Sequence, residues 1–447
     1  MSQVTGRTRF LPPFFMIGMA RDPLGFLSGL HERHGSFVSV RAGRHVYPLI
    51  EPELIREVLV TQASSFAKGR GLEMARRLLG NGLLTANGEE HLRQRRLVQP
   101  AFHRQRLQRY AEVMGDVTAA RLSRWRDGQC LCLSREMMAT TLEIITQTMF
   151  GESIGTRAEV VEEAMNEALE RFQVGLLPLL PLLELLPLPS NRRFQSAREQ
   201  LDGVILDLIR TRRQNPEDRG DLLSMLLAAV DEGQQMSDQQ LRDEAMTIFL
   251  AGHETTANAL AWTFALLAQH PQEMVRVQAE VDQVLNGRLP GFADLERLPA
   301  CRRALQESMR LHPPAWIIGR QATEKVQIGG EWLEPGSVVL MTTWAAHRHG
   351  RFFPQPERFW PARWADSEWE KSLPKFAYFP FGGGNRVCIG EHFARMEALL
   401  ILASVVQSWD FRLLAGQMPS PEPRITLRLK GGLPVQLWRR RGLAQAV

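Results

Sequence analysis

The stretch PFGGGNRVCIG, residues 380–390, places three consecutive glycines just ahead of one cysteine. The sequence after Cys388, IGEHFARMEALLILASVVQSW, has the apolar spacing of an amphipathic helix. Cys388 is therefore predicted at or just before a helix N-terminus, where the helix dipole and unpaired N–H groups favour a thiolate. The glycines permit tight turns and close approach of backbone to a bulky group. Arg386 adds positive charge beside the sulfur.

Three interpretations of Cys388 are open from these residues alone. It is a buried cysteine after a turn, a catalytic nucleophile, or a metal ligand. His392 stands four residues further on as a base for a nucleophile, but no third group that would orient it is evident. A thiolate flanked by bare backbone and a cation suits either of the two functional interpretations.

The stretch also resembles the haem-binding signature of the cytochrome P-450 family, F-x-x-G-x-R-x-C-x-G. Its fixed positions are Phe381, Gly384, Arg386, Cys388 and Gly390. By this resemblance Cys388 is the axial thiolate ligand of haem b, a ligand type that favours O–O cleavage, and loop amides hydrogen-bond its sulfur. Phe381 packs over the thiolate side of the porphyrin, and Arg386 pairs with a propionate. The implied fold is mainly α: a single triangular, helix-rich domain over residues 1–447, with small β-sheets at its edges and a long central helix.

That central helix is predicted over residues 238–270, DQQLRDEAMTIFLAGHETTANALAWTFALLAQH. Ser237 or Asp238 can cap its start and Pro271 closes it. At about 1.5 Å per residue it is about 50 Å long. Its middle is apolar nearly all round, which predicts a buried helix.

Within this helix, Ala251 to Thr256 read AGHETT and resemble the family's oxygen-binding stretch, A/G-G-x-D/E-T-T/S. A glycine leaves room beside the helix and a threonine hydroxyl can bond the i−4 carbonyl, so Gly252 and the threonines are predicted to loosen it. The groove beside Ala251 and Gly252 would then hold O2 and water, with Thr255 bonding the distal oxygen. Glu254 would deliver protons through water. His253 is interpreted as packed or water-linked rather than as an iron ligand.

An acid tolerated in a long helix is the simpler alternative for Glu254, but a carboxylate in apolar surroundings is costly to bury.

A second supporting motif is Glu307-Ser308-Met309-Arg310, just before Pro313 and Pro314. Glu307 and Arg310 are three residues apart and share a helix face, so they can pair, as in an ordinary surface salt bridge. The resemblance implies that the pair is coupled to a later arginine. Aligning PQPERFWPARW with the family pattern makes that residue Arg363, with Arg358 as the alternative.

For the haem propionates the resemblance implies His91 and Arg95, one helical turn apart in GEEHLRQRRLV, and Arg320. His347 has either a packing role or a role at the haem edge. The basic run over residues 91–109 lacks an aromatic platform or a recognised reading motif, so nucleic-acid binding is not expected. It is a solvated helix face or, by the resemblance, a cationic surface for an acidic electron donor.

Composition sets wide limits. The chain has 447 residues, 44% of them apolar, a net charge of +5 and four cysteines. This suits one large domain or two, without a disulfide framework. The cysteines at 130 and 132 lack a second pair at zinc spacing. The N-terminal apolar patch, interrupted by Pro12 and Pro13, is too short to span a bilayer. A cytoplasmic protein is expected, with at most peripheral membrane contact.

Residues 174–191, VGLLPLLPLLELLPLPSN, are densely apolar but contain four prolines. They are either a buried loop between helices or a flexible apolar lid for substrate entry or membrane contact.

Together the motifs predict a haem-thiolate monooxygenase that hydroxylates an apolar organic substrate with one O2-derived oxygen atom. A carotenoid or another terpenoid is the first substrate class, and a fatty acid the next. No fused reductase is expected, so electrons would come from a ferredoxin or flavodoxin with its NAD(P)H-dependent reductase. The alternatives are a peroxide-driven haem-thiolate peroxygenase, which the Glu254–Thr255 pair argues against, and a non-catalytic haem sensor or electron carrier.

Overall fold

The computed structural model describes residues 8–10, 12–35, 37–42, 44–151, 164, 167, 189–215, 217–231, 234–414 and 418–440. The chain forms two compact units, each assembled from separate stretches. Unit 1 consists of Met1–Arg70, Gln306–Cys388 and Pro421–Arg428. Unit 2 consists of Gly71–Leu305, Ile389–Ser420 and Leu429–Val447. A single domain over the whole chain therefore stays a prediction.

Unit 1 is built around a six-stranded sheet in the order β1-β2-β3-β11-β8-β4. Its strands are β1 (Thr8–Phe10), β2 (Val38–Ala42), β3 (Arg44–Leu49), β4 (Phe66–Ala67), β8 (Ile318–Ala322) and β11 (Val338–Met341). β2 and β3 pair antiparallel, whereas β3 and β11 pair parallel. The buried side chains of this sheet, such as Leu49 and Val339, pack with Ile55 of α3 (Pro52–Arg56) in one apolar cluster.

The other regular elements of unit 1 are short, apart from its two N-terminal helices. The helices include α1 (Pro12–Arg21), α2 (Pro23–His34), the π-helical turn η1 (Glu57–Thr61), α15 (Thr343–Ala346), η6 (Pro361–Ala365), α16 (Ser367–Ser372) and η7 (Gly384–Arg386). Two further two-stranded sheets complete the unit: β9 (Val326–Ile328) pairs with β10 (Glu331–Leu333), and β13 (Pro421–Pro423) pairs with β14 (Leu427–Leu429). Residues 36–60, SFVSVRAGRHVYPLIEPELIREVLV, are predicted from the sequence as a small hairpin followed by a helix, and they contain β2, β3 and α3.

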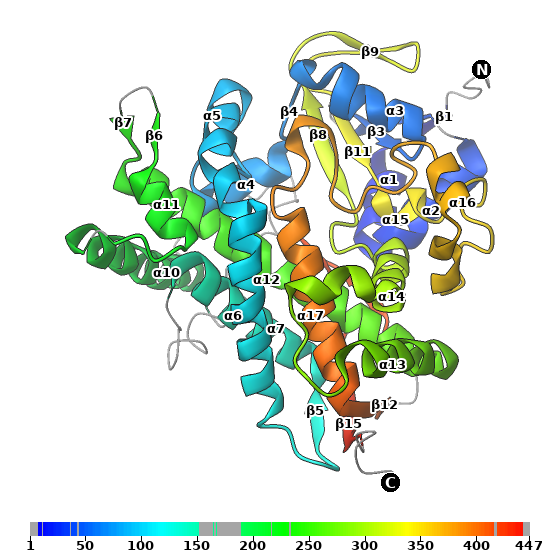
Figure 1. The fold of residues 1–447 in the computed structure, drawn as a ribbon. Helices are drawn as coiled ribbons and strands as arrows, with labels where there is room; N and C mark the ends of the chain where they lie inside the picture. The colour runs from blue at the N-terminus through cyan, green and yellow to red at the C-terminus, as the bar shows by residue number, and fades with distance from the viewer. Residues whose placement is uncertain are drawn as a thin grey trace. The chain divides into compact units, whose positions relative to one another are not determined.

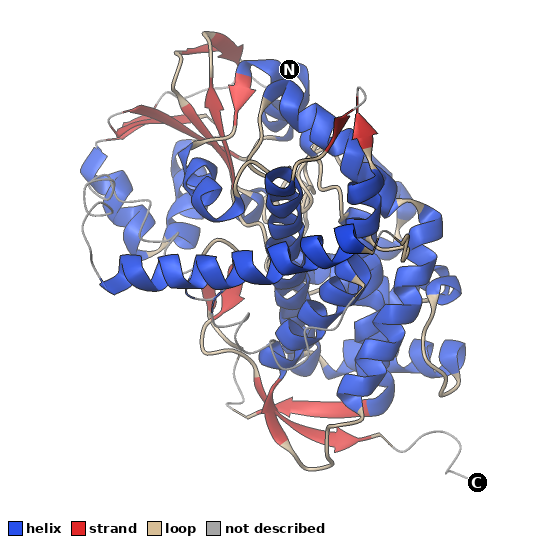
Figure 2. Ribbon diagram, turned by 90° about the vertical axis from the view of Figure 1, so that its left-hand side faces the viewer, coloured by secondary structure: helices blue, strands red, loops and turns tan. Residues whose placement is uncertain are grey.

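Unit 2 is mainly helical (Figures 1 and 2). Its helices are α4 (Arg70–Leu79), α5 (Gly88–Val98), α6 (Arg104–Leu122), α7 (Leu133–Phe150), α10 (Pro189–Gln214), α11 (Leu222–Ala228), α12 (Asp238–Gln269), α13 (Pro271–Leu285) and α17 (Glu391–Ser408), with α14 (Pro299–Leu311) running from unit 2 into unit 1. Its strands form the sheet β12 (Trp409–Leu413), β15 (Pro434–Arg439), β5 (Cys130–Cys132) and the hairpin β6 (Val230–Asp231) with β7 (Gln234–Gln235).

The predicted long helix is confirmed as α12, Asp238–Gln269. Ser237 is its N-cap, and its hydroxyl accepts a hydrogen bond from the Gln240 amide at 3.2 Å. Pro271 follows the C-cap His270 and opens α13. The apolar middle of α12 is buried, as its composition predicts.

Gly-Gly pairs stand between strand-like runs in VQIGGEWLEPGSVVLMTTW and ITLRLKGGLPVQLW, which predicts a turn in each segment. The strands around the two turns pair differently. Gly329 and Gly330, both at positive φ, turn the hairpin between β9 and β10 as predicted. Gly431 and Gly432 also have positive φ, but the strands on either side of them do not pair: β14 pairs with β13, and β15 with β12 and β5. The second pair therefore also lies in a turn between two strands, as predicted, but those strands have other partners, because hydrophobic alternation does not identify a strand's partner.

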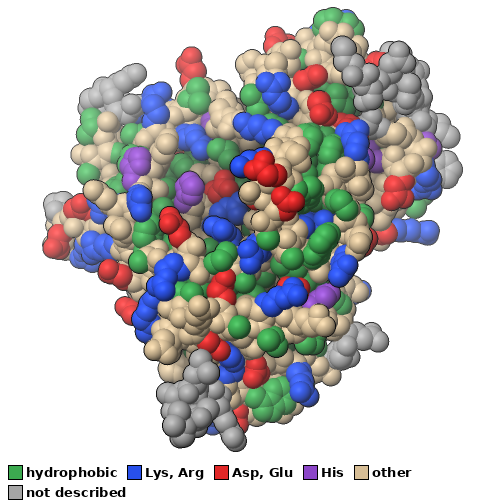
Figure 3. Space-filling view, turned by 45° about the vertical axis from the view of Figure 1, so that its right-hand side comes forward, with side chains coloured by type: hydrophobic (Ala, Val, Ile, Leu, Met, Phe, Trp, Pro, Cys, Tyr) green, Lys and Arg blue, Asp and Glu red, His purple; other side chains and the backbone are tan. Residues whose placement is uncertain are grey.

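Among the described residues, no helix is both long and apolar enough to cross a membrane. The apolar segment over residues 174–191 lies outside the described residues up to 188, and its last three residues begin α10. On the face drawn in Figure 3, Lys and Arg side chains lie among Asp and Glu side chains, in keeping with the small net charge of +5.

Candidate active site

The cysteine loop is held mainly by its own backbone. The Gly382 amide donates to the Phe379 carbonyl at 2.9 Å, and the Cys388 amide donates to the Phe381 carbonyl at 2.9 Å. The Cys388 side chain is exposed and forms no disulfide. Gly390 is the N-cap of α17, which begins at Glu391, so Cys388 lies two residues before the N-cap, just ahead of the helix as predicted. Because the Cys388 and Val387 amides both serve loop carbonyls, donation to the sulfur would have to come from other loop N–H groups.

The three glycines are needed by the loop itself. Gly382 and Gly384 have φ of 73° and 69°, in the region that side chains disfavour. A Cβ on Gly384 would lie 2.0 Å from the Leu59 carbonyl oxygen, and one on Gly383 would lie 2.1 Å from the Phe376 ring. The bare backbone is thus explained by turn geometry and by packing against unit 1 neighbours, before any bound group is considered.

Glu307 forms the centre of a buried polar cluster in unit 1. Its carboxylate accepts five hydrogen bonds at 2.8 to 3.0 Å: two from Arg310, one from Arg363, one from the Trp364 indole and one from the Trp360 amide. Glu307 and Arg310 are fully buried and Arg363 nearly so. The pair is therefore a core ion pair rather than a surface salt bridge.

The arginine that joins this pair is Arg363. The Arg358 side chain instead donates to the Gln355 side chain at 2.9 Å, and only its backbone carbonyl meets Arg310, at 3.2 Å. The remaining donors of Arg310 and Arg363 bind backbone carbonyls of residues 347 and 354–358. The cluster thus ties α14 to the loop that precedes η6.

His347 connects this cluster to the cysteine loop. Its carbonyl accepts from Arg310 at 2.9 Å, and its ring Nε2 accepts from the Phe379 amide at 3.0 Å. Burial is the main reason that its pKa lies well below the ordinary value, with Arg310 and Arg348 adding to the effect. A neutral ring with Nε2 as acceptor fits this geometry. Of the two roles open for His347, the contacts within unit 1 favour packing and bracing of the loop.

The face of α12 opens at three neighbouring residues. Between Leu241 and Leu267 every residue is buried except Ala251, Gly252 and Thr255. The Thr255 hydroxyl donates to the Ala251 carbonyl at 2.8 Å, the i−4 bond predicted from the sequence. Because its proton is used in this way, the lone pairs of Thr255 Oγ remain to accept a hydrogen bond at the accessible face. Glu254, the adjacent residue, is buried.

The predicted loosening of this helix is not seen, because α12 is α-helical at every residue. Gly252 has a packing role: a Cβ there would lie 2.8 Å from Ile145 Cδ1 of α7. His253 is buried, stacks on Phe249 at 6.2 Å and places Nδ1 3.2 Å from the Phe249 carbonyl. These contacts agree with a packed histidine.

Comparison with known proteins decides the family. The family model for cytochrome P-450 matches residues 8–434. Cyclooctatin synthase from Streptomyces melanosporofaciens is 41% identical over 92% of this chain and 90% of that protein. Cyclooctat-9-en-7-ol 5-monooxygenase of the same organism is 38% identical over 89% and 86%. Pentalenene oxygenase from Streptomyces avermitilis is 35% identical over 94% and 95%. The crystal structure of a cytochrome P-450 haem domain matches with a TM-score of 0.87 and 26% identity, covering 96% of this chain and 95% of that one.

The chain belongs to the cytochrome P-450 family. The predicted mainly α P-450 fold, the enzyme class and the haem b cofactor are thereby confirmed: this P-450 is a haem-dependent monooxygenase.

Unit 1 of this P-450 offers donors that fit a haem. The exposed Cys388 thiol provides a sulfur ligand. Lys68 and Arg320 are buried, and Arg386 is half-buried. Burial chiefly lowers the pKa of Arg320 to about 10 and holds that of Lys68 well below normal, and in both cases the positive charge of Arg386 contributes. A group of like charges in partly buried surroundings is stabilised by an anion, which the two propionates of haem b would supply.

Sequence reasoning missed Lys68. Its motif, AKGRG, carries no signal of its own, and its position opposite Arg320 depends on the pairing of β4 with β8.

The remaining predicted propionate residues lie on α5 in unit 2. His91 is buried and Arg95 is half-buried, one helical turn apart. They belong to unit 2, whereas Arg320, Phe381, Arg386 and Cys388 belong to unit 1. Their roles towards haem stay predictions.

A second residue that the sequence reasoning missed is Glu397 on α17. It is fully buried, and burial raises its pKa well above the ordinary value. Thr256 of α12 is the polar side chain that approaches it and partly offsets this effect. Neither carboxyl oxygen has a well-formed hydrogen bond within the part of the chain that the structure describes. The surroundings of Glu397, next to Thr256, therefore favour its neutral form.

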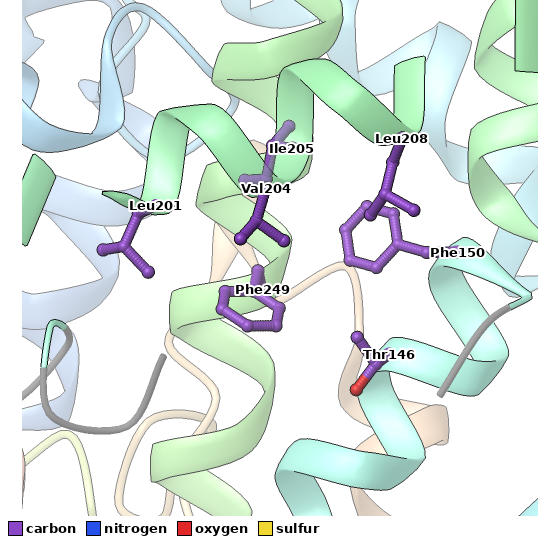
Figure 4. A pocket seen from close by; sticks show the side chains of 7 residues that line it. All are labelled: Thr146, Phe150, Leu201, Val204, Ile205, Leu208 and Phe249. Atoms are coloured by element: carbon purple, nitrogen blue, oxygen red, sulfur yellow. The ribbon is translucent and has the colours of Figure 1, made fainter. Parts of the chain in front are cut away.

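A small apolar hollow lies among three helices of unit 2 (Figure 4). It is lined by Thr146 and Phe150 of α7, Leu201, Val204, Ile205 and Leu208 of α10, and Phe249 of α12. The rings of Phe150 and Phe249 pack edge to face at 6.1 Å.

Among the described residues, no group of three or more His, Cys, Asp or Glu side chains could hold a metal ion.

Proposed function

We propose that this P-450 hydroxylates a largely apolar terpenoid, with Cys388 as the iron ligand and electrons from a separate ferredoxin or flavodoxin. The observation that carries the proposal is the accessible face of α12, because Ala251, Gly252 and Thr255 are open in an otherwise buried stretch. These are the residues for which the AGHETT motif predicts oxygen chemistry.

Bound haem b supplies the redox chemistry that divides O2 between substrate and water. The protein's part is positioning and proton supply. The Thr255 hydroxyl donates its hydrogen bond to the Ala251 carbonyl. Its oxygen, Oγ, therefore accepts a hydrogen bond from a water molecule at the α12 face. Glu254 is the acid that delivers protons to that water. Arg320, Arg386 and Lys68 are proposed propionate partners, as are His91 and Arg95.

The substrate class is supported by the relatives. Their names refer to cyclooctat-9-en-7-ol, an unsaturated alcohol, and to pentalenene, an alkene. Both names describe molecules that are mostly hydrocarbon, in keeping with a terpenoid as the first substrate class. A carotenoid is one form of that class, and a fatty acid is the alternative.

The electron donor is proposed to dock on basic residues of α5 and α6. Arg96 of α5 and Arg104 and Arg109 of α6 are exposed. An acidic ferredoxin or flavodoxin served by an NAD(P)H-dependent reductase complements these charges. The proposed location is the cytoplasm, where such donors are found.

Optical titration of the purified protein tests the substrate class directly. A cyclic terpenoid alkene, a carotenoid and a long-chain fatty acid are added separately, and the shift of the haem Soret band is followed. Saturable binding of the terpenoid at a concentration at least tenfold below that of the fatty acid is expected. Tighter binding of the fatty acid would overturn the terpenoid proposal.

Turnover distinguishes the oxygen source. With O2, NAD(P)H, a reductase and a ferredoxin, a hydroxylated product is expected that carries one labelled atom from ¹⁸O2. The Thr255→Ala variant should divert electrons to hydrogen peroxide and lower product per NAD(P)H by about tenfold. If wild-type protein forms product equally well with peroxide alone, the peroxygenase alternative is favoured instead.

A further inference from the structure

Two consecutive acids of α12 bind the turn between α4 and α5. The three helices are labelled in Figure 1. The Asn81 amide donates to Asp243 Oδ2 at 2.8 Å, and the Leu83 amide donates to Glu244 Oε2 at 3.0 Å. The amides of residues 81 and 83 in one turn thus bind the carboxylates of two adjacent residues that lie more than 160 positions later in the sequence. All of these residues belong to unit 2.

Glycines let the turn lie directly on the helix. A Cβ on Gly80, which has φ of 64°, would lie 2.0 Å from Asp243 Oδ1. A Cβ on Gly82 would lie 2.3 Å from Thr247 Oγ1. The close approach therefore depends on bare backbone at both positions.

The same turn is bonded to α5. The Gln94 side chain donates to the Asn81 carbonyl at 2.6 Å, and the Asn81 side chain donates to Glu90 at 2.5 Å. Glu90 and Gln94 each precede a predicted propionate residue, His91 and Arg95. The position of the turn on α12 consequently fixes the position of α5.

The two acids differ in their surroundings. Asp243 accepts from Arg242 at 2.9 Å and from Gln239 at 2.8 Å. The other donors of Arg242 serve Asp202 and the Leu78 carbonyl. Glu244 is fully buried, and its Oε1 has no hydrogen-bond partner within the described chain.

The charges that face Glu244 are mainly negative. Asp243 on its own helix and Glu90 on α5 both raise its pKa, while the Leu83 amide lowers it. Burial is the largest cause, and together these effects raise the pKa to about 8. The cations nearby are bonded elsewhere: Arg242 as described, and Arg76 of α4 to the Thr85 carbonyl at 3.0 Å.

We propose that Asp243 and Glu244 are positioning residues that hold the Gly80–Leu83 turn, and with it α5, and that ionisation of Glu244 releases this hold. The neutral acid accepts from Leu83 without burying a charge. The ionised form is a buried carboxylate between Asp243 and Glu90, which draws water into the contact. The link to haem rests on the proposed function, because it needs His91 and Arg95 to bind propionates.

The test compares Glu244→Gln with wild type in the haem-loaded full-length protein. Glutamine keeps an acceptor for the Leu83 amide but does not titrate. The measurement is the rate of haem transfer to excess apomyoglobin between pH 6.5 and pH 9. We expect the wild-type rate to rise roughly tenfold with pH and the E244Q rate to rise less than twofold, after correction for the acceptor.

Two further variants separate this mechanism from a merely structural role. Asp243→Asn should raise the transfer rate at every pH and keep a pH dependence, with its midpoint moved to lower pH because the Asp243 charge raises the pKa of Glu244. Glu89→Gln, at an exposed acid of α5, should behave like wild type. An unchanged pH dependence in E244Q, or an equal loss of it in E89Q, would overturn the proposal.

Hydrogen exchange gives a reading that does not involve haem or substrate. After correction for intrinsic rates, amides 81–83 should lose protection between pH 7 and pH 9 in wild type and keep it in E244Q. If exchange behaves as expected but haem transfer does not respond to pH, the proposed hold of Asp243 and Glu244 on the turn is supported, and the propionate roles of His91 and Arg95 are contradicted. If neither hydrogen exchange nor haem transfer responds to pH, the proposed hold of Glu244 on the turn is wrong.

Discussion

Glu307 in unit 1 and Glu397 in unit 2 are both fully buried glutamates on helices, but they resolve the cost of burial in opposite ways. Glu307 accepts five hydrogen bonds, three of them from arginine side chains. Glu397 has Thr256 as its polar neighbour, and its pKa is raised well above the ordinary value. The first is stabilised as a carboxylate by its partners, and the second stays protonated.

The difference shows that burial alone does not determine the charge of an acid. A buried carboxylate is tolerated when donors and cations replace its water, and otherwise it takes up a proton. Glu244 is intermediate in its supply of donors, because one of its oxygens has a backbone donor, and burial is the main cause that raises its pKa to about 8. The supply of donors therefore separates three glutamates of the same burial.

Replacing Glu307 should have the largest effect. Glu307→Gln leaves Arg310 and Arg363 buried without their counter-charge, and breaking such a pair costs about 3–5 kcal/mol. The measurement is the free energy of unfolding in urea. Glu334→Gln, in a pair with Lys325 whose two side chains are both exposed, is the control and should change it by less than about 0.5 kcal/mol. An E307Q loss as small as that of E334Q would contradict the interpretation of the cluster.

Glu397→Gln should have the opposite sign and depend on pH. Because the folded-state pKa of Glu397 is raised, folded protein keeps a proton that unfolded protein releases above its ordinary pKa of about 4.5. Wild-type stability therefore falls as pH rises from that value, by at most about 1.4 kcal/mol per pH unit for this group. E397Q lacks this loss, so it should match wild type near pH 4.5 and exceed it at pH 7.

Infrared spectroscopy checks the same point independently. A protonated-carboxyl band of wild type at pH 7 should be absent from E397Q. A variant less stable than wild type at pH 7, with no such band lost, would show that Glu397 is ionised.

The buried cluster around Glu307 could be predicted from the sequence. The E-x-x-R spacing and the PARW segment predicted Glu307, Arg310 and Arg363, and the structure brings these three side chains together. Local patterns also predicted α12 with its Ser237 cap and the position of Cys388 before α17. In each of these cases the chemistry is carried by residues close together in a recognisable pattern.

The burial of Glu397 could not be predicted from the sequence. Glu397 lies in the run RMEALLILASVV, where an acid looks like the polar face of an amphipathic helix. Its burial follows from the packing of α17 against α12, a long-range contact with no local signal. Lys68 and the two acids at 243 and 244 were missed for the same reason. Gly252 was noticed, but its role in admitting Ile145 depends on where α7 packs.

Arg363→Lys should have a smaller effect than either glutamate variant. Lysine keeps the charge but cannot bond Glu307 together with the Pro354 and Gln355 carbonyls, so a loss of about 1–3 kcal/mol is expected. Arg358→Lys is the matched control, because its side chain is exposed, donates to Gln355 and lies over the Trp360 ring at 5.7 Å, without a bond to Glu307. Equal losses in the two variants, measured by urea unfolding, would show that Arg363 holds no special place in the cluster.

The smallest effect is expected at Thr256, whose hydroxyl donates to the Gly252 carbonyl at 3.3 Å and approaches Glu397. Thr256→Val should cost about 1 kcal/mol. Thr263→Val is the control, since its hydroxyl makes a similar bond to the Ala259 carbonyl at 2.7 Å on the same helix. Thr256→Val should also raise the pKa of Glu397 further, because the contact with Thr256 lowers it.

A double-mutant cycle isolates the contact between Thr256 and Glu397. In the E397Q background the cost of T256V should differ from its cost in wild type, whereas the cost of T263V should be the same in both backgrounds. Costs that add independently for T256V and E397Q would mean that the threonine does not act on the acid. The protonation of Glu397 would then be set by burial alone, and the contrast with Glu307 would rest on arginine supply rather than on hydroxyl donors.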